Sequence, residues 1–398
     1  MFVGIVGKPS CGKSTFFKAA TLAEVEIANY PFTTIKPNHA IGFVKIDCVD
    51  KEFDKQCQPK TGFCLKNNRF VPVDLMDVAG LVPGAHTGLG MGNQFLDDLR
   101  QADALVHVVD ISGSINEKGE PVEPLSYDPA KDILFLEEEL DMWYLGILKK
   151  GWERFARTVM QEKGNIAIAI GKQLSALKVT EEMAEDVIKK IGLDIEKPDT
   201  WTEEQLKTVA VELRKLTKPM IIAANKIDVP GAGKNFERVK EQFKDRMIIP
   251  CSAESELALR EAARHGLIEY VSGEDDFKIL DDSKLNEKQK KGLEFVKSNV
   301  LAKYRTPGVQ DVLNKAVFDL LKYIAVFPVA EKLGDQSGNI LPDCFLVPEG
   351  TTALEFAFTI HTDIGNKFIR AIDVKKNITV GKDHPLKHRD VIEIVTGK

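Results

Sequence analysis

The sequence lacks the features of membrane, fibrous and disordered proteins. No apolar run approaches the ~20 residues that span a bilayer, so we expect no membrane partner. The first seven residues carry no basic leader and are interpreted as a strand rather than a signal peptide. Internal repeats and low-complexity segments are absent. The net charge of −6 disfavours coating of nucleic acid by the whole surface, so any RNA contact must be local.

Closely paired cysteines are missing as well. Six cysteines are scattered along the chain without a CxxC pair: Cys11, Cys48, Cys57, Cys64, Cys251 and Cys344. This pattern favours free thiols in a reducing cytosol, and therefore a cytoplasmic protein. A metal ion shared by Cys57 and Cys64 is the alternative, which the lack of a second close pair disfavours.

Short β-branched runs alternate with helical periodicity. This predicts an α/β fold with a doubly wound, mainly parallel sheet covered on both faces. The expected strands are Phe2–Val6, Phe70–Met76, Ala104–Asp110, Met220–Ala224 and Met247–Pro250. A helical insertion separates the third from the fourth.

Two capping signals lie in the insertion. Asp128-Pro129 predicts one helix start, and Thr202 with Gln205 forms a capping-box pattern before another helix. Four basic residues here are either a functional patch or, as we favour, a solvated helix face: Lys149, Lys150, Arg154 and Arg157.

A phosphate-loop motif directly follows the first strand. Residues 7–14 match G-x-x-x-x-G-K-[ST] and precede a helical segment. Glycines let the backbone wrap around a phosphate, and the helix N-terminus faces the anion. Lys13 is expected to reach the β- and γ-phosphates, and the Ser14 hydroxyl to ligate Mg²⁺. The predicted nucleotide contacts are Gly7, Lys8, Pro9, Ser10, Cys11, Gly12, Lys13, Ser14 and Thr15.

Two further motifs are typical of switch segments. Asp77 and Gly80 form a D-x-x-G motif after the second strand, where the acid can hold Mg²⁺ through water and the glycine amide can contact the γ-phosphate. Release of such a loop on loss of the γ-phosphate is the physical basis of a switch. One threonine of the pair Thr33-Thr34 is expected to complete the magnesium shell.

A guanine-reading motif ends the fourth strand. Asn225, Lys226 and Asp228 form N-K-x-D, and the Asp228 carboxylate can accept hydrogen bonds from N1–H and the 2-amino group of guanine. Adenine lacks both donors and would leave a buried carboxylate unpaired. A backbone contact to the guanine oxygen is expected from Ser252, Ala253 and Glu254. Four ordered motifs at strand ends predict a GTP/GDP site.

The motifs resemble the Obg family of GTPases, in particular its YchF-related branch. The resemblance rests on residues 29–38, residues 77–90, residues 95–100 and the pair Asp128-Pro129. It implies a P-loop NTPase G domain, with Thr34 as the magnesium threonine and Lys13, Gly80 and Thr34 as catalytic groups. We expect a G domain over 1–127 and 217–275, a helical insertion over 128–216, a helical connector over 276–322 and a final domain over 323–398.

This chain departs from YchF proteins proper, which have a degenerate base motif and prefer ATP. It keeps Asn225 and Asp228, and so resembles the GTP-preferring archaeal and fungal sister group. A YchF-type ATPase is the nearest alternative. Ser10 stands where many relatives have the Asn that in some GTPases helps to hold potassium, so K⁺ stimulation is not favoured.

The residue after D-x-x-G predicts slow hydrolysis. Ras-type enzymes use a Gln there to orient the attacking water, whereas this chain has Leu81. We expect Lys13, Mg²⁺ and backbone amides to stabilise the transferring phosphate, while another group or a partner positions water. His86 is a candidate, although an idle surface histidine is the more common case.

The C-terminal segment resembles a TGS domain, a β-grasp module. The matching residues are 347–352, 357–365 and 390–395, with Arg389 in place of a usual Gly. Eight basic against five acidic residues after position 360 give this segment a net charge of +3. This charge is compatible with contacts to the phosphate backbone of a nucleic acid, and equally with basic residues that keep an exposed sheet edge from pairing with another strand. The family implies ribosome or RNA binding, and we expect a monomer.

Two other classes compete with a GTPase switch. A P-loop kinase would need an acceptor pocket and an arginine-rich lid, and the D-x-x-G and N-K-x-D motifs disfavour it. An RNA-binding module with a purely structural nucleotide is the second alternative.

Overall fold

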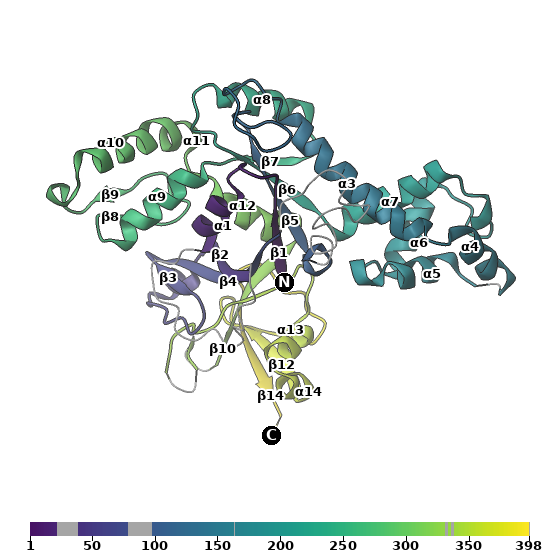
Figure 1. Cartoon of the computed structure of the whole chain (residues 1–398). Helices are drawn as coiled ribbons and strands as arrows, with labels where there is room; N and C mark the ends of the chain where they lie inside the picture. The colour runs from purple at the N-terminus through teal and green to yellow at the C-terminus, as the bar shows by residue number, and fades with distance from the viewer. Residues whose placement is uncertain (22–38, 79–97, 163, 331–332, 336–337, 398) are drawn as a thin grey trace. The chain divides into compact units, whose positions relative to one another are not determined.

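The computed structural model describes residues 1–21, 39–78, 98–162, 164–330, 333–335 and 338–397. The chain forms two compact units, one of residues 1–17 and 75–254 and one of residues 18–74 and 255–398 (Figure 1). None of the helices in these described ranges has the length and apolar character needed to cross a membrane.

Parallel strands form the centre of the first unit. β5 pairs with β1 on one side and with β6 on the other, and β7 pairs with β6. The strands are β1 (Phe2–Val6), β5 (Ala104–Asp110), β6 (Met220–Asn225) and β7 (Met247–Pro250). All seven residues of β5 are buried, as expected for a parallel strand covered on both faces. Side chains that follow these strands therefore meet at one sheet edge.

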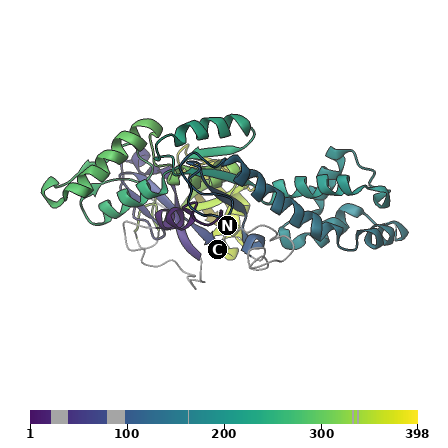
Figure 2. The same ribbon diagram turned by 45° about the horizontal axis from the view of Figure 1, so that its top comes forward.

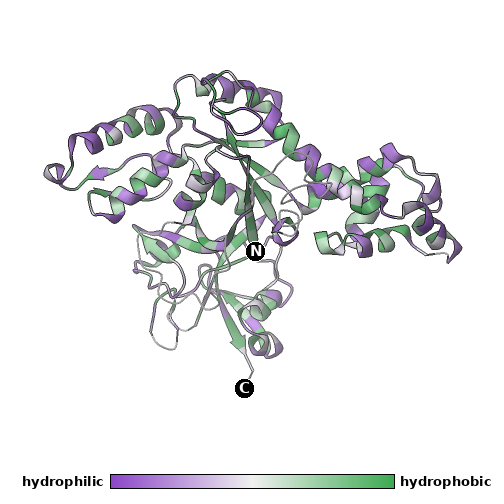
Figure 3. Ribbon diagram, in the orientation of Figure 1, coloured by the Kyte–Doolittle hydropathy of each residue, from purple (hydrophilic) through white to green (hydrophobic). Residues whose placement is uncertain are grey.

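Helices flank these strands along the chain. α1 (Lys13–Thr21) follows β1, α8 (Ala232–Gln242) connects β6 to β7, and α9 (Ala253–Arg264) begins at the end of this unit. The strands are largely apolar in Figure 3, which agrees with their burial.

An all-helical region lies between β5 and β6. It comprises α3 (Ala130–Lys149), α4 (Trp152–Gln161), α5 (Ile166–Gln173), η3 (Ser175–Leu177), α6 (Glu181–Ile191), η4 (Pro198–Thr200) and α7 (Glu203–Thr217). In Figures 1 and 2 the shorter helices α4–α6 lie at the ends of α3 and α7 far from the sheet. The predicted capping box is confirmed, because Thr202 and Gln205 bond each other's backbone at the start of α7. Asp128 also accepts a bond from the Ala130 amide at 3.1 Å.

The second unit contains β2 (His39–Asp47), η1 (Val49–Phe53), β3 (Phe63–Leu65) and most of β4 (Asn68–Asp77). β3 and β4 form an antiparallel hairpin whose two-residue turn, Lys66-Asn67, has φ of 48° and 59°. These positive φ values are typical of the type I′ turns that match the twist of a hairpin.

Helices and two short strands continue this unit. They are β8 (Ile268–Glu269), β9 (Lys278–Ile279), η5 (Asp282–Lys284), α10 (Glu287–Val296), η6 (Lys297–Leu301), α11 (Ala302–Tyr304), α12 (Val309–Asn314) and η7 (Lys315–Leu320). The Gln310 side chain on α12 donates to the Phe43 carbonyl of β2 at 2.8 Å. This contact joins the connecting helices to the strands that open the unit.

A five-stranded mixed sheet ends the chain, in the order β11-β10-β14-β12-β13. Its elements are β10 (Tyr323–Val329), β11 (Phe345–Pro348), α13 (Ala353–Ile360), α14 (Thr362–Asn366), β12 (Phe368–Asp373), β13 (Ile378–Val380) and β14 (Val391–Thr396). β10 and β14 are parallel, and the buried Phe356 of α13 belongs to a core shared with these strands.

The predicted fold class is confirmed, namely an α/β sheet domain with a helical region and a C-terminal β-grasp module. All five expected strands are present, with β4 starting at Asn68 and β6 ending at Asn225. The sequence pattern did not predict β2 and β3, nor two short strands at Ile268–Glu269 and Lys278–Ile279.

Candidate functional site

The phosphate loop connects β1 to α1 and is tightly packed. Gly12 has φ of +94°, and a Cβ atom there would lie 2.2 Å from the Nδ2 atom of Asn225. A Cβ atom at Gly7 would lie 2.6 Å from the carbonyl oxygen of Val108. Only glycine fits both positions, because the backbone is pressed against neighbouring polar atoms. The loop therefore presents main-chain amides where the sequence predicts phosphate.

Two side chains form an ion pair, one predicted to bind phosphate and the other predicted to bind magnesium. The Lys13 ammonium at the start of α1 forms an ion pair with the Asp77 carboxylate at the end of β4. Ser14 is exposed beside Lys13, so its hydroxyl is open to a ligand. An exposed hydroxyl and a carboxylate at one sheet edge are oxygen donors of the kind that Mg²⁺ prefers. Thr34, Gly80, Leu81 and His86 lie outside the described residues.

Asn225 connects the phosphate loop to the far end of the site. Its side-chain Nδ2 atom donates to the Cys11 carbonyl at 2.9 Å, and its Oδ1 atom accepts from the Ala253 amide at 3.0 Å. Asn225 is 3% exposed. Its role in this geometry is to hold two backbone segments together, rather than to present an open side chain to a base.

Asp228 is the acid that remains open. It is partly buried just after β6, and within the described ranges no hydrogen bond or ion pair engages its carboxylate. The Ile227 amide donates to the Cys251 carbonyl at 3.1 Å, which fixes this turn against the segment of Ser252 and Ala253. A carboxylate with free acceptor capacity on a fixed turn suits the two donors of guanine.

Lys226 is oriented by an acid that the sequence analysis missed. Its Nζ atom lies 3.0 Å from Asp110 Oδ2 and 3.2 Å from the Ser114 hydroxyl. Asp110, 1% exposed at the end of β5, also accepts bonds from Ser112. The available signal was the run Asp-x-Ser-x-Ser at a strand end, which is typical of a side chain satisfying local backbone amides.

The side chain of Lys8 contacts residues outside the phosphate loop, so only its backbone can contribute to the predicted phosphate site. Its Nζ atom lies 2.7 Å from Asp132, 3.2 Å from the Ile115 carbonyl and 4.0 Å from the centre of the Tyr127 ring. Burial raises the pKa of Asp132, an effect that the bound Lys8 opposes. The ammonium of Lys8 is therefore already paired, and its amide remains for a phosphate.

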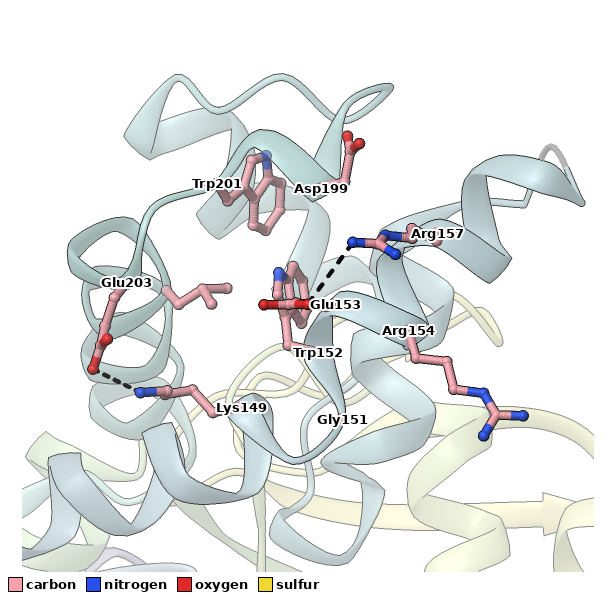
Figure 4. Close-up of a pocket in the computed structure, with 10 residues that line it drawn as sticks. Lys149, Gly151, Trp152, Glu153, Arg154, Arg157, Asp199, Trp201 and Glu203 are labelled. Atoms are coloured by element: carbon pink, nitrogen blue, oxygen red, sulfur yellow. Dashed lines mark hydrogen bonds and ion pairs between the residues drawn. The ribbon is translucent and has the colours of Figure 1, made fainter.

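Three of the four basic residues considered as a patch in the helical region, Lys149, Arg154 and Arg157, line a cavity of about 700 Å³ together with acidic and aromatic side chains (Figure 4). Lys149 pairs with Glu203 at 2.7 Å, and Arg157 lies 3.8 Å from Glu153. Arg154 extends away from the stacked indoles of Trp152 and Trp201 in Figure 4, whose ring centres are 5.5 Å apart. These local pairs support the interpretation of a solvated helix face.

Comparison with known proteins finds three family matches along the chain. Residues 2–138 match the family described as 50S ribosome-binding GTPase, residues 223–331 the G4-motif domain of YGR210-like Obg-like GTPases, and residues 335–396 the TGS domain.

Individual relatives cover almost the whole chain. An uncharacterized GTP-binding protein of Methanocaldococcus jannaschii is 50% identical over 396 residues, covering 99% of this chain and 98% of that one. The ribosome-binding ATPase YchF of Bacillus subtilis is 30% identical over 92% of this chain and 87% of its own. The crystal structure of a GTP-binding protein from Pyrococcus horikoshii covers 100% of both chains with a TM-score of 0.79 at 36% identity.

Proposed function

Because this chain belongs to the YchF-related branch of the Obg-like GTP-binding proteins, we propose that it hydrolyses GTP slowly with Mg²⁺ and acts as a nucleotide switch in translation. The observation that carries the choice of GTP is the open Asp228 carboxylate beside the fixed Asn225. A base with two adjacent donors satisfies Asp228, whereas adenine leaves it unpaired. Some relatives carry the name ATPase, so the choice of nucleotide is the first property to test.

Replacement of one residue tests this choice. Asp228→Asn removes an acceptor for two charge-assisted hydrogen bonds, so GTP affinity should fall at least about 100-fold. Xanthine nucleotides should gain affinity, because an amide offers the complementary donor to their 2-oxo group. Competition of labelled GTP by GTP, ATP and XTP on both proteins measures the change. Displacement of GTP by ATP at equal concentration from the wild-type protein would contradict the proposal.

The hydrolytic step rests on charge stabilisation. Lys13 binds and orients the terminal phosphates, and Mg²⁺ held by Ser14, Asp77 and Thr34 would supply further positive charge there. Backbone amides of the loop and of Gly80 complete the donors. Leu81 contributes no hydrogen bond to water, so we propose slow intrinsic turnover and a partner that positions the nucleophile.

A ribosomal or other structured RNA is the proposed partner of the TGS domain. Lys375 and Arg389 are paired with Glu52 at 2.7 and 2.6 Å. Within the described residues, four exposed basic side chains of this domain have no ion-pair partner: Lys367, Arg370, Lys382 and Lys387. Unpaired basic groups are suited to phosphate-backbone contacts. We propose a cytoplasmic monomer that reaches RNA through this domain and the helical insertion.

Ribosome co-sedimentation tests the partner. Lys367→Ala with Arg370→Ala should weaken binding in the presence of a non-hydrolysable GTP analogue, and the loss should shrink at high salt. Lys375→Ala, which removes a paired cation, is the matched control. Equal binding of the GTP-analogue and GDP forms would remove the case for a switch. Phosphate release that ribosomes leave unchanged would favour an RNA-binding module with a structural nucleotide.

A further inference from the structure

Four potential metal ligands meet beside the β3–β4 hairpin of the second unit. One ligand atom from each of Cys48, Asp50, Cys57 and Cys64 lies within 4.8 Å of all the others. The Sγ atoms of Cys48 and Cys57 are 3.6 Å apart, and Cys64 Sγ lies 3.9 Å from Asp50 Oδ2. The structure thus supplies the close partners that the spacing of Cys57 and Cys64 alone did not show.

The spacing of these atoms fits a tetrahedral ion. Zinc–sulfur bonds of about 2.3 Å and zinc–oxygen bonds of about 2.0–2.2 Å place neighbouring ligand atoms of a tetrahedron ~3.5–3.8 Å apart. The two distances above are close to that range. Three segments contribute, namely the end of β2 with η1, the following loop, and β3. The Cys48 amide donates to the Asn67 carbonyl in the hairpin turn at 2.8 Å, which holds these segments in register.

Asp50 is a fully buried acid that lacks a cationic partner. It is 0% exposed, and in the described part of the chain no Lys, Arg or His forms an ion pair with it. Its Oδ1 atom accepts from Asn67 Nδ2 at 3.2 Å, and Oδ2 accepts from the Cys57 amide at 3.4 Å. A buried carboxylate is costly unless a charge or a metal offsets it. The bond from Asn67 is the kind of outer contact that orients a metal ligand.

Arg69 adds a second buried charge close by. It is 0% exposed on β4, and its guanidinium donates to the carbonyls of Leu341 at 3.1 Å and Pro342 at 2.9 Å. Its Nε atom has no hydrogen-bond partner in the described structure. Three thiolates and one carboxylate around a divalent ion leave a net negative charge, and Arg69 would offset part of it.

We propose that Cys48, Cys57 and Cys64, with the carboxylate of Asp50, bind one structural zinc ion. Each thiol releases its proton to solvent as its sulfur bonds the metal. Three thiolates favour zinc over calcium or magnesium, which prefer oxygen ligands. A closed set of four protein ligands indicates a structural rather than a catalytic site. The ion would fasten the hairpin to the end of β2, independently of nucleotide binding in the first unit.

Metal analysis of the purified full-length protein tests the site without any variant. Elemental analysis is expected to find about one zinc ion per chain after dialysis. Reconstitution of the metal-free protein with Co²⁺ is expected to give the intense thiolate-to-cobalt absorption of a tetrahedral site. A chelator should lower the melting temperature of the wild-type protein. Zinc at a small fraction of the chain concentration with no cobalt spectrum overturns the proposal, as does a Cys48–Cys57 disulfide in protein purified without oxygen.

Variants identify the ligands. Cys48→Ser, Cys57→Ser and Cys64→Ser should each lose most of the zinc, and the chelator should no longer change their melting temperature. Cys251→Ser, which changes a buried thiol of the first unit, is the matched control and should keep it. Asp50→Asn should weaken zinc binding. If Asp50→Asn keeps the metal and Cys344→Ser loses it, the proposed ligand set is wrong.

Discussion

The side-chain amide of Asn225 donates a 2.9 Å hydrogen bond to the main-chain carbonyl of Cys11 in the phosphate loop. The same side chain accepts the Ala253 amide at 3.0 Å. One buried residue therefore connects the end of β6 both to the loop expected to bind phosphate and to the segment expected near the guanine oxygen. We therefore expect this side chain to help fix the separation between the predicted phosphate-binding and base-binding segments.

Asn225→Ala is predicted to weaken the binding of GTP and the binding of GDP by similar factors. It removes two buried hydrogen bonds worth about 1 kcal/mol each, and this corresponds to about a 30-fold loss of affinity. The loss should also apply to any residual ATP binding, since it acts through the backbone. Titration with fluorescent nucleotides measures all three. A loss confined to guanine nucleotides, as expected for Asp228→Asn, would show instead that Asn225 acts on the base.

Gly12→Ala is predicted to abolish nucleotide binding while leaving the fold intact. The new methyl group would lie 2.2 Å from Asn225 Nδ2 at a φ of +94°, so the loop must move and its bond to Asn225 must break. Calorimetric titration with GDP measures the loss, and circular dichroism checks the fold.

Gly146→Ala is the matched control for that change. Gly146 lies within α3 and a Cβ atom there meets nothing within 4 Å. Its replacement should leave affinity unchanged and stabilise the helix by about 0.5–1 kcal/mol. Wild-type affinity in Gly12→Ala would mean that the loop adopts another conformation when nucleotide binds.

Asp77→Asn is predicted to separate the effects of magnesium and phosphate. In this structure Lys13 is paired with Asp77, so a phosphate must compete with that carboxylate for the ammonium. The variant frees Lys13, and GDP should bind at least as tightly as to the wild-type protein when Mg²⁺ is chelated. The enhancement of affinity by added Mg²⁺ should fall, because an amide is a weaker ligand than a carboxylate. Filter binding of GDP to the wild-type protein and to the variant, with and without chelator, measures both effects. A lower GDP affinity of the variant without Mg²⁺ would contradict the proposed competition between Asp77 and phosphate for Lys13.

The sequence allowed the fold class and the positions of the motifs to be predicted, for one physical reason. Parallel strands present their carboxyl ends at one edge, so polar residues that directly follow β1, β4 and β6 must converge there. Lys13, Asp77 and Asn225 could be placed in this way without any knowledge of their contacts.

The contacts themselves could not be predicted. The pairing of Lys226 with Asp110 depends on the exact register of β5 and β6, which the apolar pattern does not specify. The cysteine cluster depends on a hairpin whose turn is Lys66-Asn67, without the glycine that usually signals such a turn. Eight residues separate Cys48 from Cys57, and six separate Cys57 from Cys64, so the spacing resembles no short zinc motif.

Acid sensitivity of the first unit should arise in part from His107 on β5. Burial, together with the nearby charge of Lys8, lowers the pKa of this 3% exposed imidazole from 6.5 to about 3. The unfolded chain therefore binds one more proton than the folded chain between those two pH values. Stability from this residue is complete above pH 6.5 and is lost as the pH falls towards 3, at about 1.4 kcal/mol per pH unit.

His107→Leu removes the imidazole that takes up this proton and places an apolar side chain at the buried position. The free energy of unfolding of the wild-type protein should therefore fall more steeply between pH 6 and pH 4.5 than that of the variant, by about 1.4 kcal/mol per pH unit. Urea unfolding followed by tryptophan fluorescence reports on this unit, because all three tryptophans lie in it. Parallel pH profiles for the two proteins would show that His107 takes up its proton without unfolding, and would place the acid-sensitive group elsewhere.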